Sequence, residues 1–145
     1  MRIANRKAYH DYFILETFEA GIALAGSEVK SLRLGRCNLQ ESFVKTLDDG
    51  LYLINCHIPP FQGSQLNISP DRDRKLLMHK KEILYLTQHN TQKSISIIPL
   101  SVYFKNNLVK VQIALAKPKK LADKRATLKK AAMDRDIAKS LRSKI

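Results

Sequence analysis

The basic residues of this chain gather at its C-terminal end, in a pattern suited to binding phosphate. Residues 117–145 hold 11 of the 26 Lys and Arg residues, against three acidic residues and no aromatic residue. Lysine and arginine neutralise phosphates and release condensed counterions, which drives binding to nucleic acid. A segment of this composition builds no hydrophobic core of its own. The sequence therefore indicates a compact body followed by a cationic tail, with nucleic acid or an anionic membrane as the leading partner.

Histidine and cysteine, which often carry catalysis or bind metal, show no recognisable spacing here. The four histidines are scattered, and Cys37 and Cys56 form neither a CxxC motif nor a Cys/His pattern. His10 and Asp11 are adjacent, and neighbours in a strand point to opposite faces, so this pair alone defines no nuclease site. We therefore expect no catalytic residue, no metal and no cofactor, and we expect the two cysteines to be partly buried free thiols.

The body shows the residue pattern of β-strands. Residues 10–24 are rich in aromatic and β-branched residues and predict two strands, or one long strand bent at Gly21. Hairpins are expected at residues 42–58 and 94–116, because Asp48-Asp49-Gly50 and Lys105-Asn106-Asn107 supply the residues that tight turns require.

Two short helices are expected between these strands. Ser27 is placed to cap the first helix, and Gly35 is placed to end it. The second begins near His79, where Glu82 follows three residues later as in a capping box. Lys75–Met78 is compatible both with a strand and with an early helical turn.

About six antiparallel strands with short helices indicate a mainly β protein. The expected architecture is a small closed antiparallel barrel, like that of the oligonucleotide-binding (OB) fold, at residues 1–120. Residues 121–145 form the basic tail, where Met133, Ile137, Leu141 and Ile145 recur at four-residue spacing. An isolated helix of this length is marginal in water, so we expect the tail to be disordered when free and helical on a partner.

The N-terminal residues lack the apolar segment of a signal peptide, and no apolar run approaches the length of a membrane span. We therefore expect a cytoplasmic protein, and a monomer.

Several short motifs, taken in order, resemble one bacterial family. They are Asn5-Arg6-Lys7-Ala8, Tyr12-Phe13-Ile14, Glu19-Ala20-Gly21-Ile22-Ala23-Leu24, Gly26-Ser27-Glu28-Val29-Lys30-Ser31-Leu32-Arg33, Asn38-Leu39, Arg72-Asp73-Arg74-Lys75-Leu76-Leu77, Ala116-Lys117-Pro118-Lys119-Lys120 and Asp123-Lys124-Arg125. This ordered set resembles the SsrA-binding protein family (small protein B), the partner of transfer-messenger RNA in trans-translation. The chain departs from the family pattern at Pro118, where Gly is usual, and at Ala122, where His or Tyr is usual.

The resemblance implies a non-enzymatic RNA adaptor for ribosome rescue. The body would bind the tRNA-like domain of transfer-messenger RNA (tmRNA, SsrA). The tail would enter the empty mRNA channel of a stalled small ribosomal subunit, near the decoding centre, and contact 16S rRNA. The implied RNA-binding residues are Asn5, Arg6, Lys7, Glu19, Arg33, Lys75, Leu76, Leu77, His79, Lys110 and Lys119. The implied ribosome-contacting residues are Asp123, Lys124, Arg125, Lys129, Lys130, Ile137 and Leu141.

Within this set, Glu19 needs a separate explanation, because a carboxylate facing phosphates is unfavourable on charge alone. It fits as an acceptor of hydrogen bonds from base or ribose groups in an unpaired loop. Either Leu76 or Leu77 could equally be a core residue.

Two other functional classes stay open at the level of sequence. A basic ribosomal protein could thread such a tail through rRNA on every ribosome. A membrane-surface protein could use the apolar stripe of the tail, although this stripe is narrow and lacks Trp and Phe.

Overall fold

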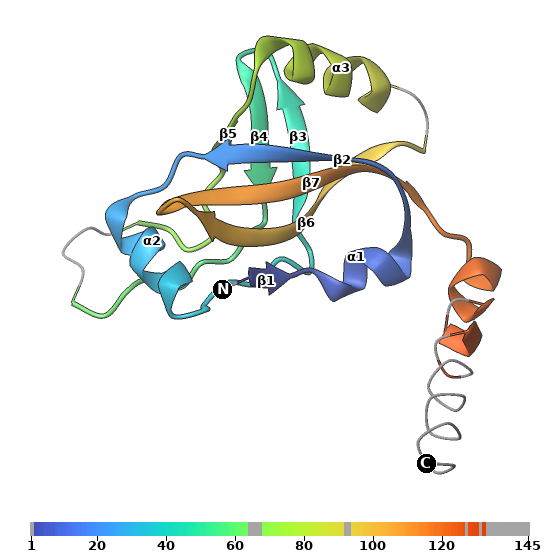
Figure 1. Ribbon diagram of the computed structural model, residues 1–145, viewed down its shortest axis with the longest axis horizontal. Coiled ribbons are helices and arrows are strands. Elements are labelled where there is room, and N and C mark those ends of the chain that lie inside the picture. Colours follow the sequence, from blue (N-terminus) through green and yellow to red (C-terminus); the bar gives the residue numbers. More distant parts are fainter. Residues whose placement is uncertain (1, 64–67, 92–93, 127, 131, 133–145) are drawn as a thin grey trace.

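The computed structural model describes residues 2–63, 68–91, 94–126, 128–130 and 132, and is dominated by one antiparallel sheet (Figure 1). Its elements are β1 (Arg2–Ala4), α1 (Arg6–Asp11), β2 (Tyr12–Ile22), α2 (Gly26–Arg33), β3 (Phe43–Leu47), β4 (Gly50–Ile54), β5 (Arg74–Leu77), α3 (Lys80–Asn90), β6 (Ser96–Lys105) and β7 (Leu108–Pro118). The strand order is β1-β6-β3-β4-β5-β2-β7, and β6 also pairs with β7. Strands β2 to β7 therefore form a closed ring, which confirms the mainly β fold with short helices.

Both expected hairpins are present, and their turns explain why. In the β3–β4 hairpin, Leu47 pairs with Gly50, whose φ of 143° suits glycine. In the β6–β7 hairpin, Asn106 and Asn107 have φ values of 51° and 64°. Two successive left-handed residues form the turn that matches the natural twist of paired strands.

Strand β2 is continuous, and the expected break at Gly21 is absent. The pairing with β7 is irregular only between Ile14 and Glu16, so the irregularity lies five to seven residues before Gly21. A Cβ atom on Gly21 would lie 3.3 Å from the Cβ of Leu77 on β5. Glycine is therefore used at this position for the close approach of a neighbouring strand, not for a bend.

The remaining local expectations have mixed outcomes. Lys75 and Leu77 belong to strand β5, which settles the ambiguous segment. Helix α2 ends before Gly35 as expected, but it begins at Gly26, one residue before the expected cap Ser27. Helix α3 follows His79, with no capping hydrogen bond from that side chain. Strand β1 and helix α1 were not predicted, because their residues lack a clear period.

The hydrophobic core fills the ring and is closed by two helices. Leu32 of α2 and Leu86 of α3 are fully buried in it, next to strand residues such as Leu53 and Ile113. A second, smaller cluster lies on the side of β6 and β7 that faces away from the interior of the ring, where Ala8 of α1 packs. Helix α1 therefore covers one end of that side of the two strands.

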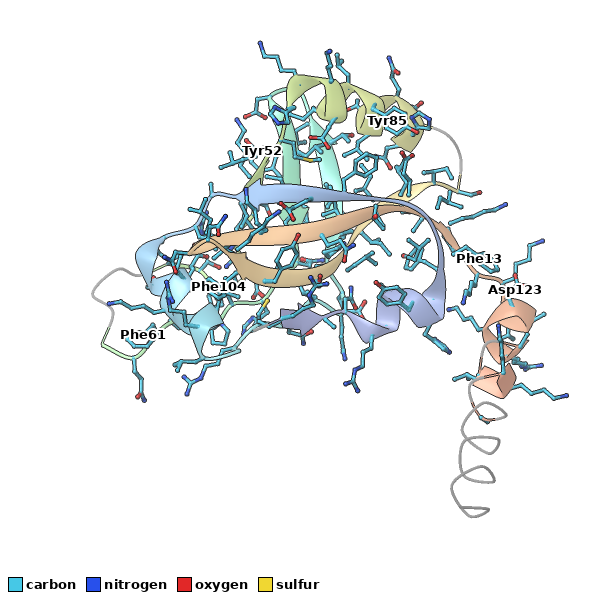
Figure 2. All side chains as sticks on the ribbon, in the orientation of Figure 1. Phe13, Tyr52, Phe61, Tyr85, Phe104 and Asp123 are labelled. Carbon is cyan, nitrogen blue, oxygen red and sulfur yellow. The ribbon has the colours of Figure 1, made fainter. Side chains whose placement is uncertain are left out.

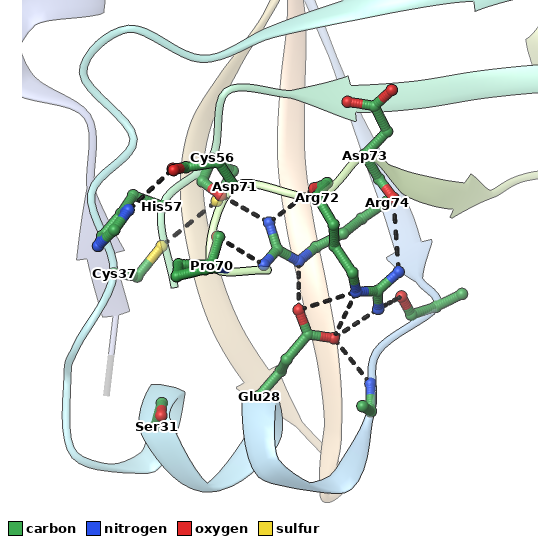
Figure 3. A network of polar contacts seen from close by, with 12 residues as sticks. Glu28, Ser31, Cys37, Cys56, His57, Pro70, Asp71, Arg72, Asp73 and Arg74 are labelled. Atoms are coloured by element: carbon green, nitrogen blue, oxygen red, sulfur yellow. Dashed lines mark hydrogen bonds and ion pairs between the residues drawn. The ribbon is translucent and has the colours of Figure 1, made fainter. Parts of the chain in front are cut away.

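A buried ionic network ties α2 to the segment that leads into β5 (Figure 3). Arg74 is fully buried, and its Nε donates to Glu28 Oε2 at 2.6 Å. Its two terminal nitrogens donate to the carbonyl oxygens of Cys56 and Pro70, at 2.6 and 2.9 Å. Arg72 donates to the other oxygen of Glu28 at 2.5 Å. All three nitrogen atoms of the Arg74 guanidinium therefore donate to an acceptor, as a buried charge requires.

Cys37 and Cys56 lie close to this network as free thiols, with their sulfur atoms 3.5 Å apart. Cys56 is buried and Cys37 is half-buried, so the expectation of partly buried free thiols is confirmed.

None of the helices in the described part of the chain has the length and apolar character that a membrane span needs.

Candidate RNA-binding surface

The outer face of the sheet is organised in rows that run across the strands. Leu77 on β5 pairs with Gly21 on β2, Gly21 pairs with Lys110 on β7, and Lys110 pairs with Tyr103 on β6. Tyr103 in turn pairs with Arg2 on β1. Because directly paired residues share a face, this row places side chains from five strands on one surface.

Glu19 and Gln112 form the next row on the same face. Glu19 is two residues from Gly21 in β2 and pairs with Gln112, which is two residues from Lys110 in β7. Side chains two residues apart in a strand lie on the same face. Gln112 pairs with Ser101, whose hydroxyl donates to its amide oxygen at 3.4 Å. We call the two rows, Arg2, Glu19, Leu77, Tyr103, Lys110 and Gln112, the outer face.

The acidic residue of the outer face is held by its basic and phenolic neighbours. The hydroxyl of Tyr103 donates to Glu19 Oε2 at 2.5 Å, and Lys105 Nζ lies 3.3 Å from Oε1. The Tyr103 hydrogen bond, followed by Lys105 and Lys110, lowers the pKa of Glu19 below its ordinary value. The carboxylate therefore stays ionised, and can accept further hydrogen bonds from a ligand.

One edge of this surface is formed by β5 and the start of α3. Lys75 and Leu77 alternate outward from β5 and are exposed, and the exposed His79 precedes α3. Lys75 Nζ lies 3.9 Å from Asp49 Oδ2. Leu76 points the other way and is 1% exposed, in the core of the ring. This corrects the inclusion of Leu76 among the RNA-binding residues, because a core side chain presents no surface to RNA.

The predicted residues of the N-terminal motif divide between core and surface. Asn5 is 3% exposed, and its Nδ2 donates to the carbonyl oxygens of Leu39 and Pro99 at 3.2 and 2.9 Å. Asn5 therefore fastens α1 to the body, which corrects its assignment as a direct RNA contact. Arg6 and Lys7 are exposed on α1, and Lys7 forms an ion pair with Glu41. Neither belongs to the two rows above.

Arg33 also lies outside the outer face. It is exposed at the end of α2, with its guanidinium 5.0 Å from the ring centroid of Phe104. A guanidinium stacked on an aromatic ring keeps its donors free at the edge, so Arg33 stays available to phosphate.

Lys119 and the first tail residues dock beside the start of β2, near the labelled Phe13 and Asp123 in Figure 2. Lys119 N donates to the carbonyl oxygen of Asp11 at 2.8 Å, and its Nζ lies 5.1 Å from the centroid of Phe13. Lys124 Nζ is 3.4 Å from Asp11 Oδ1. Residues 121–126 are helical, and Lys119 and Lys124 connect the start of the tail to Asp11.

The other predicted tail residues are only partly within the described chain. Asp123 accepts from Lys120 N at 3.3 Å, and Arg125, Lys129 and Lys130 are exposed. Ile137 and Leu141 lie outside the described residues. Disorder of the free tail and its helical state on a ribosome stay predictions.

Sequence reasoning missed four residues around Glu19 and Lys110 as site candidates. Those residues are Arg2, Tyr103, Lys105 and Gln112. One signal was available, because a two-residue turn at Asn106-Asn107 fixes the hairpin register and places Tyr103 opposite Lys110. No sequence signal places β1 or β2 next to that hairpin.

Comparison with known proteins decides the family. The family model described as SmpB protein matches residues 2–143. This chain belongs to the SmpB protein family. An SsrA-binding protein of Carboxydothermus hydrogenoformans is 52% identical over 141 residues, which cover 97% of this chain and 95% of that protein. An SsrA-binding protein of Sulfurihydrogenibium sp. is 53% identical over 142 residues, covering 97% and 93% of the two chains.

A solved structure agrees with this family membership. A chain from the structure described as "tmRNA-SmpB: a journey to the center of the bacterial ribosome" is 48% identical to this one. It has a TM-score of 0.71, over 83% of this chain and 85% of that chain. This match confirms both the resemblance seen in the sequence and the mainly β fold of the SmpB family.

Proposed function

We propose that this protein is a non-enzymatic adaptor that binds the tRNA-like domain of tmRNA and delivers it to stalled ribosomes in the cytoplasm for trans-translation. The observation that carries the proposal is the outer face, which presents Glu19, Leu77 and Lys110 together, on a chain of the SmpB family. The relatives are described as SsrA-binding proteins, and the matching structure as tmRNA–SmpB in the ribosome.

The chemistry of the outer face suits a folded RNA with exposed unpaired nucleotides. Lys110 and Arg2 of the outer face, with Lys75 at its edge on β5, provide cations for phosphates. Leu77 is 54% exposed and can lie against a base or ribose. Glu19 provides an acceptor, which phosphate never satisfies but base amino groups and ribose hydroxyls do. This combination of cations, one exposed apolar side chain and one fixed acceptor favours RNA recognition over plain attraction to charge.

For the tail we propose a separate partner, the small ribosomal subunit with its 16S rRNA. Residues 117–145 carry a net charge of +8 in a segment without aromatic residues, which suits a channel lined by phosphate. Asp123, Lys124 and Arg125 stand at the junction, so we expect them to lie near the decoding centre. Lys129 and Lys130 are the exposed cations that follow.

Binding to three RNAs of equal length tests the assignment of the body. These are the tRNA-like domain of tmRNA, an ordinary tRNA and an unrelated hairpin, each titrated against the full chain over a range of salt concentrations. The tRNA-like domain is expected to bind at least about tenfold more tightly than the hairpin at physiological salt, because recognition adds to the common phosphate contribution. Equal affinity for all three RNAs would contradict the proposal.

A further inference from the structure

The Glu19 carboxylate on β2 is hydrogen-bonded by side chains of β6, a strand that does not pair with β2. Strand β7 lies between β2 and β6, since Lys110 pairs with Gly21 of β2 and with Tyr103 of β6. Strands β2 and β6 are therefore about 10 Å apart. The Tyr103 side chain reaches across β7 and donates to Glu19 Oε2 at 2.5 Å. Lys105, two residues further along β6, approaches Oε1 at 3.3 Å. Both carboxylate oxygens are thus held by β6.

Tyr103 is itself held in place from the opposite side. Its partner on β1 is Arg2, whose guanidinium carbon lies 4.5 Å from the ring centroid. A cation over an aromatic face is attracted by the ring, and the contact restricts the rotamers of both side chains. The phenol is therefore fixed by Arg2 before any RNA is present.

We propose that Tyr103 is a positioning residue for recognition of unpaired nucleotides by Glu19. A carboxylate offers about four lone-pair sites, and Tyr103 and Lys105 occupy two of them. The remaining sites accept from the N–H and O–H groups of a base edge or a ribose hydroxyl. Tyr103 fixes the direction in which these sites point, so that a matching loop binds without a cost for ordering Glu19. The inference rests on the proposed binding of tmRNA.

The ionisation of this cluster supports the same geometry. The Tyr103 hydrogen bond is the largest influence that lowers the pKa of Glu19, and Lys105 and Lys110 act in the same direction. Burial, followed by the hydrogen bond to Glu19, raises the pKa of Tyr103 to about 12. Tyr103 therefore remains a donor and Glu19 an acceptor at neutral pH. Without the Tyr103 hydroxyl, the pKa of Glu19 rises toward its ordinary value.

Tyr103→Phe is the decisive variant, because it removes the hydroxyl and keeps the ring under Arg2. We expect affinity for the tRNA-like domain to fall about tenfold, since a hydrogen bond to a charged group is lost. Affinity for the unrelated hairpin is expected to be unchanged, because no charge is altered. In the double variant with Glu19→Gln, the tyrosine substitution is expected to have no further effect, because its only role is to position that carboxylate.

Tyr85→Phe is the matched control for this substitution. Tyr85 is an exposed tyrosine on α3 whose hydroxyl donates to Glu16 at 2.6 Å, so the same atom is removed from the same kind of pair (Figure 2). The control is expected to bind both RNAs as the parent does. If it weakens binding to the tRNA-like domain as much as Tyr103→Phe does, the positioning role is contradicted.

A carboxyl-carbon NMR titration of Glu19 in the free protein separates this inference from the proposed function. Tyr103→Phe is expected to raise the pKa of Glu19 toward its ordinary value, because a hydrogen bond to the ionised carboxylate is lost. An unchanged pKa, or a raised pKa with unchanged RNA affinity, overturns the positioning role. Failure of the parent to prefer the tRNA-like domain would instead contradict the proposed function.

Discussion

A chain that ends at Arg125 is expected to bind the tRNA-like domain within about twofold of the full chain, and to lose tagging of stalled nascent chains. The proposed RNA surface lies on β1, β2, β5, β6 and β7, all of which the truncated chain retains. The deletion removes six basic and two acidic residues, which we propose to meet the mRNA channel. The measurements are RNA binding and a tagging assay with ribosomes stalled on an mRNA without a stop codon.

The control for this truncation is a full-length chain in which residues 126–145 keep their composition in a shuffled order. It has the same length and net charge as the parent, but it loses the four-residue apolar spacing. We expect it to bind RNA normally and to tag poorly, because the helix proposed for the tail on the ribosome needs one apolar face. Tagging by the truncated chain at the parent's level would show that the tail assignment is wrong.

Arg74→Met is expected to lower the free energy of unfolding by about 3–5 kcal/mol, as loss of one partner from a buried ion pair does. Arg74 is fully buried and bonds to Glu28 and to the carbonyl oxygens of Cys56 and Pro70. Methionine fills a similar volume and leaves all three acceptors without this donor. Urea unfolding followed by circular dichroism measures the change.

Arg72→Met is the matched control for that substitution. The Arg72 side chain is one-third exposed, and Glu28 keeps its contacts with Arg74 and with Ala25 N when Arg72 is lost. We expect a loss of only about 1 kcal/mol, since water can replace part of the lost contact. Equal losses in the two variants would contradict the central role assigned to Arg74.

The same network gives stability a defined dependence on pH. Burial raises the pKa of Glu28, but the hydrogen bonds from Arg72, Ala25 N and Arg74 outweigh this effect and lower it overall. A carboxyl group with a lowered pKa in the folded state stabilises the protein above its unfolded pKa, and this contribution is lost as the pH falls. Its contribution is therefore present at neutral pH and disappears in acid.

Most of the fold could be predicted from local sequence, because the residues of a tight turn identify the hairpin that contains it. Gly50 and the pair Asn106-Asn107 adopt positive φ, and the strands that flank them follow at once. Strand β1 could not be predicted, since three residues form it only by pairing with β6. The interpretation of Gly21 as a bend was wrong because the cause, the approach of Leu77, is a contact between distant segments.

The candidate site was predictable in part, for a related reason. The resemblance identified Glu19, Leu77 and Lys110, and the pairing of β5, β2 and β7 brings them onto one face. Motifs that resemble a family do not separate residues that contact RNA from residues that support the fold, however. The motifs that contain Glu28 and Arg74 hold each other through an ion pair 46 residues apart in sequence. Asn5 likewise proved to be a structural residue, because its partners are backbone carbonyls that no sequence pattern reveals.

The effect of Glu19→Gln on RNA affinity separates recognition by the outer face from plain electrostatic attraction, because the two predict changes of opposite sign. The substitution removes a negative charge, so electrostatic attraction alone would make every RNA bind more tightly. Lys110→Gln, its counterpart on the same face, removes a positive charge and is expected to lower the affinity for all RNAs. Glu19→Gln is expected to weaken binding of the tRNA-like domain, while the unrelated hairpin binds as before or slightly more tightly. Tighter binding of both RNAs would contradict recognition by the outer face.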